Sequence, residues 1–352
     1  MTNGIAYGVI CMLTAVLSAV GTGLLCKHLL SRLGMRELGV KNIPATVRDV
    51  PGEGEYVPRC GGLLPACAVL VSAAVMLLVY ALICSADSLA GISRLSGLQR
   101  MYIWGGLLLA PLFCAAGFLE DYALVFRRMS RGLAGWQRLL IQAAIAAAYL
   151  AAVWLAGDRG EGITTLPFVG QVRMGFWYYP LSMVLILGVV RGAELAQEAE
   201  GVTPVAGFFS FIPLIVAAGF LSGYNAGIAD AGLMAIAGAG GCLAFLSYNM
   251  APAMARTGTA GGAFMGALLC GTAFAARMPL LLLLCGAAYI AESVTALAAW
   301  LTEKLTGRAV GAPLHRMIGR RGRNDMEITI IFAAVTALLG AAAAALAVFG
   351  KA

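Results

Sequence analysis

The chain has 352 residues, of which 61% are hydrophobic and 12% charged, and its mean hydropathy is +0.88. A soluble domain carries roughly twice that share of charged residues, so the composition excludes an ordinary soluble globular protein. The formal net charge is +7, and the charged residues cluster between long apolar intervals. We therefore attribute the positive charge to membrane topology and contact with anionic lipid, and not to nucleic-acid binding.

Ten apolar stretches are candidates for membrane-spanning helices. A spanning helix needs about 20 apolar residues, because within lipid every backbone polar group must be hydrogen-bonded inside the segment. The expected spans are residues 5–26, 63–84, 101–119, 139–156, 176–190, 205–223, 227–246, 261–276, 280–300 and 328–349. The eighth is the weakest, because it is short and rich in Gly and Ala. The sequence thus predicts an all-α polytopic membrane protein with one domain over residues 1–352.

The distribution of Lys and Arg predicts the orientation of these spans. Basic residues are retained on the cytoplasmic side of a membrane. With both termini outside, five cytoplasmic loops hold 18 of the 24 basic residues and the outer segments hold 6. The start lacks the basic n-region of a cleavable signal peptide, and its apolar run is too long for one. We therefore predict a multi-pass protein of the cell (inner) membrane with both termini outside.

Acidic residues gather at the predicted inner ends of the third and fifth spans. They are Glu120, Asp121, Glu194, Glu198 and Glu200. Only Asp230 and Glu292 lie within spans, whereas a channel or carrier usually has ionisable residues along its pathway at membrane depth. This pattern favours a site at the cytoplasmic membrane surface over a transporter. Glu292 stays open between a functional intramembrane acid and a packing group paired with Ser293 or Thr295.

Five segments carry a family resemblance. They are VPRCGG at 57–62, GFLEDYALVFRRMSRGLAGWQRLLIQ at 117–142, GAELAQEAEGV at 192–202, FLSYNMAPA at 245–253 and GAPLHRMIG at 311–319. In this order, and on inner loops, they resemble the polyprenyl-phosphate N-acetylhexosamine-1-phosphate transferases of glycosyl transferase family 4, specifically the phospho-N-acetylmuramoyl-pentapeptide transferase branch. The resemblance covers nearly the whole chain.

The resemblance implies a magnesium-dependent transfer of a sugar 1-phosphate from a UDP-N-acetylhexosamine derivative to polyprenyl phosphate at the cytoplasmic membrane face. Both substrates are anionic phosphates, so the reaction suits a cation held by carboxylates with basic residues around it. The implied catalytic residues are Glu120, Asp121, Glu200 and His315, the implied magnesium ligands are Asp121, Glu194 and Glu200, and the implied substrate contacts are Arg191, Arg316 and Asn249. A homodimer stays open as the assembly.

The chain departs from the family pattern at several of these positions. The family's Asp-Asp pair reads Glu120-Asp121, and the two Asp residues that the family has in the next inner loop become Gln197 and Glu200. A further magnesium-binding Asp of the family falls on Thr259, which supplies no anionic ligand, and a Lys of the first loop falls on Gly54. Two functions therefore remain: a divergent transferase, or a catalytically degenerate member that binds lipid phosphate or a partner without turnover.

Ordinary structural explanations stand beside the functional ones. Glu120 and Asp121 are also explained as solvated acids that cap the inner end of a span. The arginines at 316, 320, 321 and 323 equally fit an inside-retention signal, and a lone loop histidine such as His315 is usually solvated.

Overall fold

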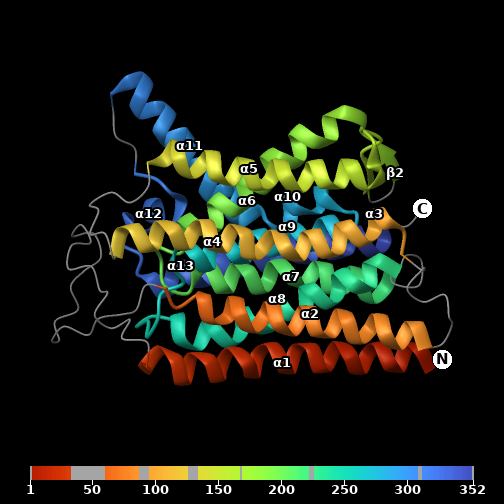
Figure 1. The fold of residues 1–352 in the computed structure, drawn as a ribbon. Coiled ribbons are helices and arrows are strands. Elements are labelled where there is room, and N and C mark those ends of the chain that lie inside the picture. Colours follow the sequence, from red (N-terminus) through yellow and green to blue (C-terminus); the bar gives the residue numbers. More distant parts are fainter. Residues whose placement is uncertain are drawn as a thin grey trace.

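The computed structural model describes residues 2–32, 60–86, 95–125, 134–166, 169–221, 226–307 and 311–350. Long helices lie side by side in one bundle (Figure 1). The elements in chain order are α1 (Thr2–Arg32), α2 (Leu63–Ala86), α3 (Gly97–Arg100), η3 (Met101–Gly105), α4 (Gly106–Val125), α5 (Gly135–Val153), η4 (Trp154–Asp158), β1 (Ile163–Leu166), β2 (Gly170–Arg173), η5 (Gly175–Trp177), α6 (Tyr178–Ala196), α7 (Val202–Leu221), α8 (Ala226–Asn249), α9 (Gly258–Ala275), η6 (Pro279–Leu281), α10 (Leu282–Cys285), α11 (Ala287–Thr306), α12 (Leu314–Gly319) and α13 (Asp325–Phe349).

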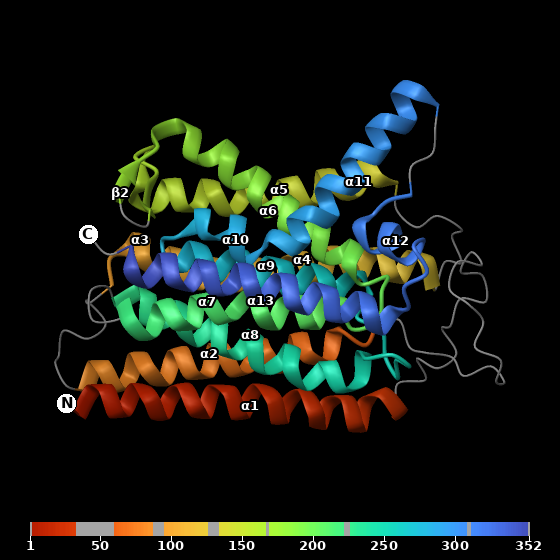
Figure 2. The ribbon, with the colours of Figure 1, turned by 180° about the vertical axis from the view of Figure 1, so that it is seen from behind.

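The predicted polytopic all-α fold is confirmed. Within the described ranges, nine helical segments are long and apolar enough to cross a membrane, and a bent pair makes up to ten. Helix α1 begins and helix α13 ends at the same end of the bundle, as an even number of spans requires (Figures 1 and 2). Which side of the membrane that end faces stays a prediction. The opposite end, where α4 ends and α12 lies, is called the charged end below.

Helix α9 forms the centre of the bundle, although its segment gave the weakest expected span. All of its residues from Gly258 to Ala275 are buried. Small residues let neighbouring backbones approach it closely: a Cβ on Gly106 would lie 2.7 Å from the carbonyl oxygen of Gly271, and one on Gly117 would lie 2.7 Å from that of Thr259. Such approach maximises dispersion contacts between helices in lipid. The low hydropathy of this segment thus reflects protein surroundings on all sides.

The ninth expected span, residues 280–300, is not one straight helix but a bent pair of helical segments. The chain bends by 80° between the η6–α10 segment and α11, with Gly286 at the break. Ser210 on α7 donates a 2.5 Å hydrogen bond to the carbonyl oxygen of Cys285, which satisfies a backbone acceptor next to the break. Helix α11 then continues to Thr306 and projects away from the bundle (Figure 1).

The segment expected as an outer loop contains a small antiparallel hairpin. Strands β1 and β2 pair with Ile163 opposite Arg173. Asp158 anchors the hairpin, since its carboxylate accepts hydrogen bonds from the backbone N–H of Gly162 at 3.1 Å and the hydroxyl of Tyr179 at 2.6 Å. The hairpin lies at the end opposite the charged end (Figure 1).

Candidate functional site

The acidic pair lies in the last turn of α4, and its two members point to different partners. Asp121 is fully buried, and its Oδ2 accepts a 3.0 Å hydrogen bond from the backbone N–H of Ala260 in the first turn of α9. The first N–H groups of a helix have no partner within the helix and carry partial positive charge. Asp121 therefore stabilises the N-terminus of α9, directly beside Thr259, where the family pattern has an acid.

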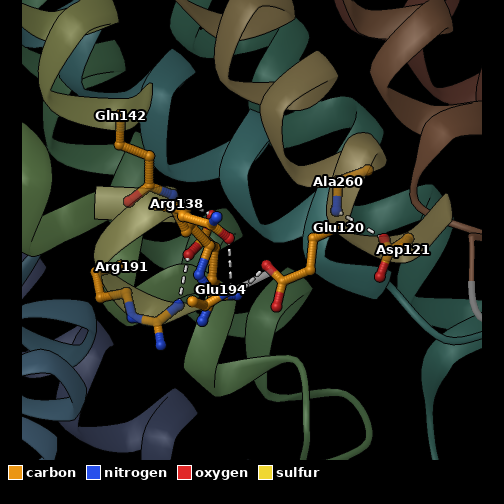
Figure 3. A network of polar contacts seen from close by, with 9 residues as sticks. Glu120, Asp121, Arg138, Gln142, Arg191, Glu194 and Ala260 are labelled. Carbon is orange, nitrogen blue, oxygen red and sulfur yellow. Dashed lines mark hydrogen bonds and ion pairs between the residues drawn. The ribbon is translucent and has the colours of Figure 1, made fainter. Parts of the chain in front are cut away.

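Glu120 turns the other way, toward α5 and α6 (Figure 3). Its carboxylate forms an ion pair with Arg138 in the first turn of α5. Glu194, near the end of α6, is buried and accepts from Gln142 at 2.5 Å and from Arg191 at 3.0 Å. One polar network thus joins three helices at the charged end, and it contains two of the predicted site acids and the predicted substrate contact Arg191.

Glu200 and Asn249 belong to a second group, which ties the turn after α6 to the segment between α8 and α9. Glu200 accepts from the backbone N–H of Ala253 at 3.1 Å and lies 3.9 Å from the Arg256 guanidinium. The Asn249 side chain accepts from the N–H of Gly201 at 3.1 Å and donates to the carbonyl oxygen of Ala255 at 2.8 Å. Both amide atoms of Asn249 are thus engaged, and its predicted substrate contact stays a prediction.

His315, in α12, lies between two carboxylates. Its Nδ1 is 3.1 Å from Glu292 Oε2, its backbone N–H donates to Glu292 Oε1 at 3.0 Å, and its Nε2 is 3.3 Å from Glu198 Oε2. Arg316 adds a 2.6 Å ion pair with Glu198. Glu292 is fully buried, so its open role is resolved toward pairing with this histidine rather than with a hydroxyl of its own helix.

The surroundings shift the proton affinities of this histidine cluster. Burial alone lowers the pKa of His315, but the interactions with Glu198 and Glu292 outweigh it and raise the pKa to about 9. Burial would raise the pKa of Glu198, yet contact with His315 and the charge of Arg316 hold that pKa below its usual value. Near neutral pH the cluster therefore holds His315 as an imidazolium between carboxylates.

The sequence did not predict two residues, Glu292 and Arg138, as members of the site. Glu292 was recognised only as a lone intramembrane acid, and Arg138 only as one inner-loop basic residue. The available signals were the isolation of Glu292 in an apolar span and the position of Arg138 one helical turn before Gln142, which places both on one face of α5.

The residues that are described do not fit a magnesium ion. Among the residues that the structure describes, no three His, Cys, Asp or Glu side chains lie close enough together to hold a metal ion. Magnesium needs near-octahedral oxygen donors at about 2.0–2.1 Å. Here the three predicted ligands, Asp121, Glu194 and Glu200, together accept hydrogen bonds from four protein groups.

An apolar groove of about 310 Å³ runs between α2, α4 and α9 toward the charged end. It is lined by Leu63, Ala66, Cys67, Leu70, Pro111, Cys114, Ala115, Phe118 and Phe264. Phe118 lies three residues before Asp121, so the two side chains share a face of α4 and the groove extends to within about one helical turn of this acid.

Comparison with known proteins identifies the family of the chain. The model of the family "Glycosyl transferase family 4" matches residues 103–277. A phospho-N-acetylmuramoyl-pentapeptide-transferase of Heliobacterium modesticaldum is 31% identical over 243 residues, which cover 67% of this chain and 74% of the relative. Proteins of the same name from Desulfitobacterium hafniense and Granulibacter bethesdensis are each 28% identical, over 64% and 72% of this chain and 69% and 74% of the relatives. The chain is therefore a multi-pass inner-membrane protein that belongs to glycosyl transferase family 4.

Proposed function

We propose that this chain binds the phosphate groups of its family's substrates, a polyprenyl phosphate and a UDP-N-acetylhexosamine derivative, at the cytoplasmic membrane face, without magnesium-dependent turnover. The observation that carries the proposal is that each acid of the candidate site has a protein partner: an arginine, the histidine or a backbone N–H. Arginines lie beside these acids, so the chain's own cations neutralise the carboxylates.

The partly exposed arginines support phosphate binding. The side chains of Arg316, Arg191 and Arg256 are 55%, 35% and 23% exposed, although each forms an ion pair. A guanidinium has five N–H donors, so one carboxylate contact leaves donors for a phosphate. Since these residues lie at the charged end, next to predicted inner loops, a lipid phosphate and a soluble nucleotide could both reach them.

The position of Thr259 supports the loss of turnover. Its hydroxyl is neutral, and it lies beside the N–H that Asp121 accepts from. Phosphoryl transfer depends on charge stabilisation and positioning, which in this family a divalent cation supplies. Without an acid at position 259, and with Asp121 committed to a helix terminus, the charged end lacks the donors for that cation.

The second candidate is catalytic sugar-1-phosphate transfer. It is favoured by the relatives, which are named phospho-N-acetylmuramoyl-pentapeptide-transferases, and by the acids retained at Glu120 and Glu194. Release of UMP from a UDP-N-acetylhexosamine derivative separates the two. If the second candidate is right, the wild-type chain releases UMP when magnesium is added, and Thr259→Asp raises the rate.

The binding test uses the full chain in nanodiscs, titrated with polyprenyl phosphate and with UDP-N-acetylglucosamine, with and without magnesium. We expect saturable binding that magnesium does not change, and no UMP release. Arg316→Gln should weaken polyprenyl-phosphate binding about tenfold, the effect of losing one charge-assisted hydrogen bond. Arg323→Gln is the matched control, because Arg323 is 58% exposed and pairs with Glu327 outside the candidate site. Equal affinity for polyprenyl phosphate and the uncharged polyprenol would contradict the proposal.

A further inference from the structure

Arg138 lies where it can neutralise two site acids from different helices. It projects from the first turn of α5, and its side chain is only 16% exposed. Its guanidinium pairs with Glu120 on α4, and its charge also acts on Glu194 on α6. In Figure 3 its side chain lies between these two carboxylates. The position is therefore that of a bridging cation among α4, α5 and α6.

Two buried carboxylates facing each other at a membrane surface need such a cation. Like charges repel strongly where the effective dielectric constant is low, and a buried acid is tolerated only when it is paired and hydrogen-bonded. Glu194 has further donors in Gln142 and Arg191. Two guanidinium groups thus face Glu120 and Glu194, and the charges of these two acids need no bound ion to balance them.

A divalent cation and Arg138 would compete for the same oxygens. Magnesium requires several carboxylate or water oxygens in near-octahedral array, whereas here N–H groups of Arg138, Arg191 and Gln142 occupy the acid oxygens. An arginine stays protonated at all physiological pH values. It is part of the chain, so unlike a bound ion it cannot dissociate.

We propose that Arg138 takes the place of a divalent cation at Glu120 and Glu194, so that the wild-type chain binds no such ion there and gains a site for one when the guanidinium is removed. This inference rests on the proposed function, in which the chain's own cations neutralise the site acids, and it names the cation that does so at Glu120.

The test is manganese binding to the purified full chain in detergent, followed by electron paramagnetic resonance of the free ion. We expect no bound manganese that depends on Glu120 in the wild type. Arg138→Gln should bind about one manganese ion per chain, and the double variant Arg138→Gln with Glu120→Gln should lose it. Arg138→Lys, which keeps the positive charge, and Arg323→Gln, which removes a distant one, should both behave as the wild type does.

Two results would overturn the inference. One is a manganese site in the wild type that Glu120→Gln abolishes. The other is Arg138→Gln that elutes and melts as a folded protein yet binds no manganese. If Arg138→Gln does not fold, the wild-type measurement with Glu120→Gln still decides. Manganese binding is measured separately from polyprenyl-phosphate affinity and from UMP release. A negative result for the role of Arg138 can therefore be distinguished from a negative result for the proposed function.

Discussion

The two acidic clusters at the charged end are neutralised by chemically different cations. Glu120 and Glu194 face arginines, which keep their charge at any physiological pH. Glu292 and Glu198 face His315, which can lose its proton, and Arg316 adds a permanent cation beside Glu198. The cations of the first cluster therefore keep their charge, whereas the second cluster contains a cation whose charge depends on pH.

The clusters also differ in what they join. The arginine cluster holds together α4, α5 and α6, whose mutual packing already fixes them in the bundle. The histidine cluster fastens the short helix α12 to α11, which projects from the bundle, and to the turn after α6. A titratable contact thus lies where a short helix joins its neighbours, and this makes the difference between the clusters measurable.

The largest expected effect comes from removing the buried acid of the histidine cluster. Glu292→Ala leaves Nδ1 and the backbone N–H of His315 without their acceptor. Breaking a buried ion pair in this way costs roughly 3–5 kcal/mol. Thermal unfolding in detergent checks it, with Glu303→Ala on the exposed part of the same helix as the control. A melting temperature for Glu292→Ala equal to that of the control would contradict the role given to this pair.

The next effect is a loss of stability at alkaline pH. The pKa of His315 is raised from 6.5 to about 9, so the folded state holds this proton more tightly than the unfolded state does. The resulting stabilisation is complete below about pH 6.5 and disappears as the pH rises through about 9, with a total of the order of 3 kcal/mol.

The measurement is the melting temperature between pH 6 and pH 10. We expect it to fall across this range in the wild type and to fall much less in His315→Gln. Arg138→Lys serves as the comparison from the arginine cluster and should keep the wild-type slope. If His315→Gln loses stability with pH as steeply as the wild type does, another group carries the dependence.

A smaller effect is expected at the N-terminus of α9. Asp121→Ala removes the acceptor for the N–H of Ala260, and loss of such a cap costs about 1–2 kcal/mol. Asp121→Asn keeps an oxygen acceptor and loses only the charge, so it should cost about 0.5 kcal/mol. Chemical denaturation of the three proteins in mixed micelles orders them. The assignment is wrong if Asp121→Ala is as stable as the wild type.

No stability change is expected from the last pair of variants, which tests the orientation. The variants are Arg321→Cys and Val169→Cys. Arg321 lies at the charged end, and Val169, whose side chain is 69% exposed, lies in the hairpin at the other end. An impermeant thiol reagent added to intact cells should label Val169→Cys only, because the inner loops hold 18 of the 24 basic residues. Labelling of Arg321→Cys from outside would invert the topology.

The sequence by itself determined the membrane class, the approximate spans and the family. Spans such as 63–84 and 328–349 are long apolar runs, and in lipid such runs can only be helices. The motif GFLEDY at 117–122 and its companions on other inner loops carried the family, since their order along the chain needs no three-dimensional information.

Only the tertiary structure decided what each charged residue does. At the 80° break before α11, the carbonyl oxygen of Cys285 accepts from Ser210, which is 75 positions away in the chain. The pairing of Glu292 with His315, 23 positions apart, and of Glu120 with Arg138, 18 apart, depends on how helices approach one another. Local propensity and hydropathy report on neighbours along the chain, whereas the neutralisation of a buried acid depends on neighbours in space.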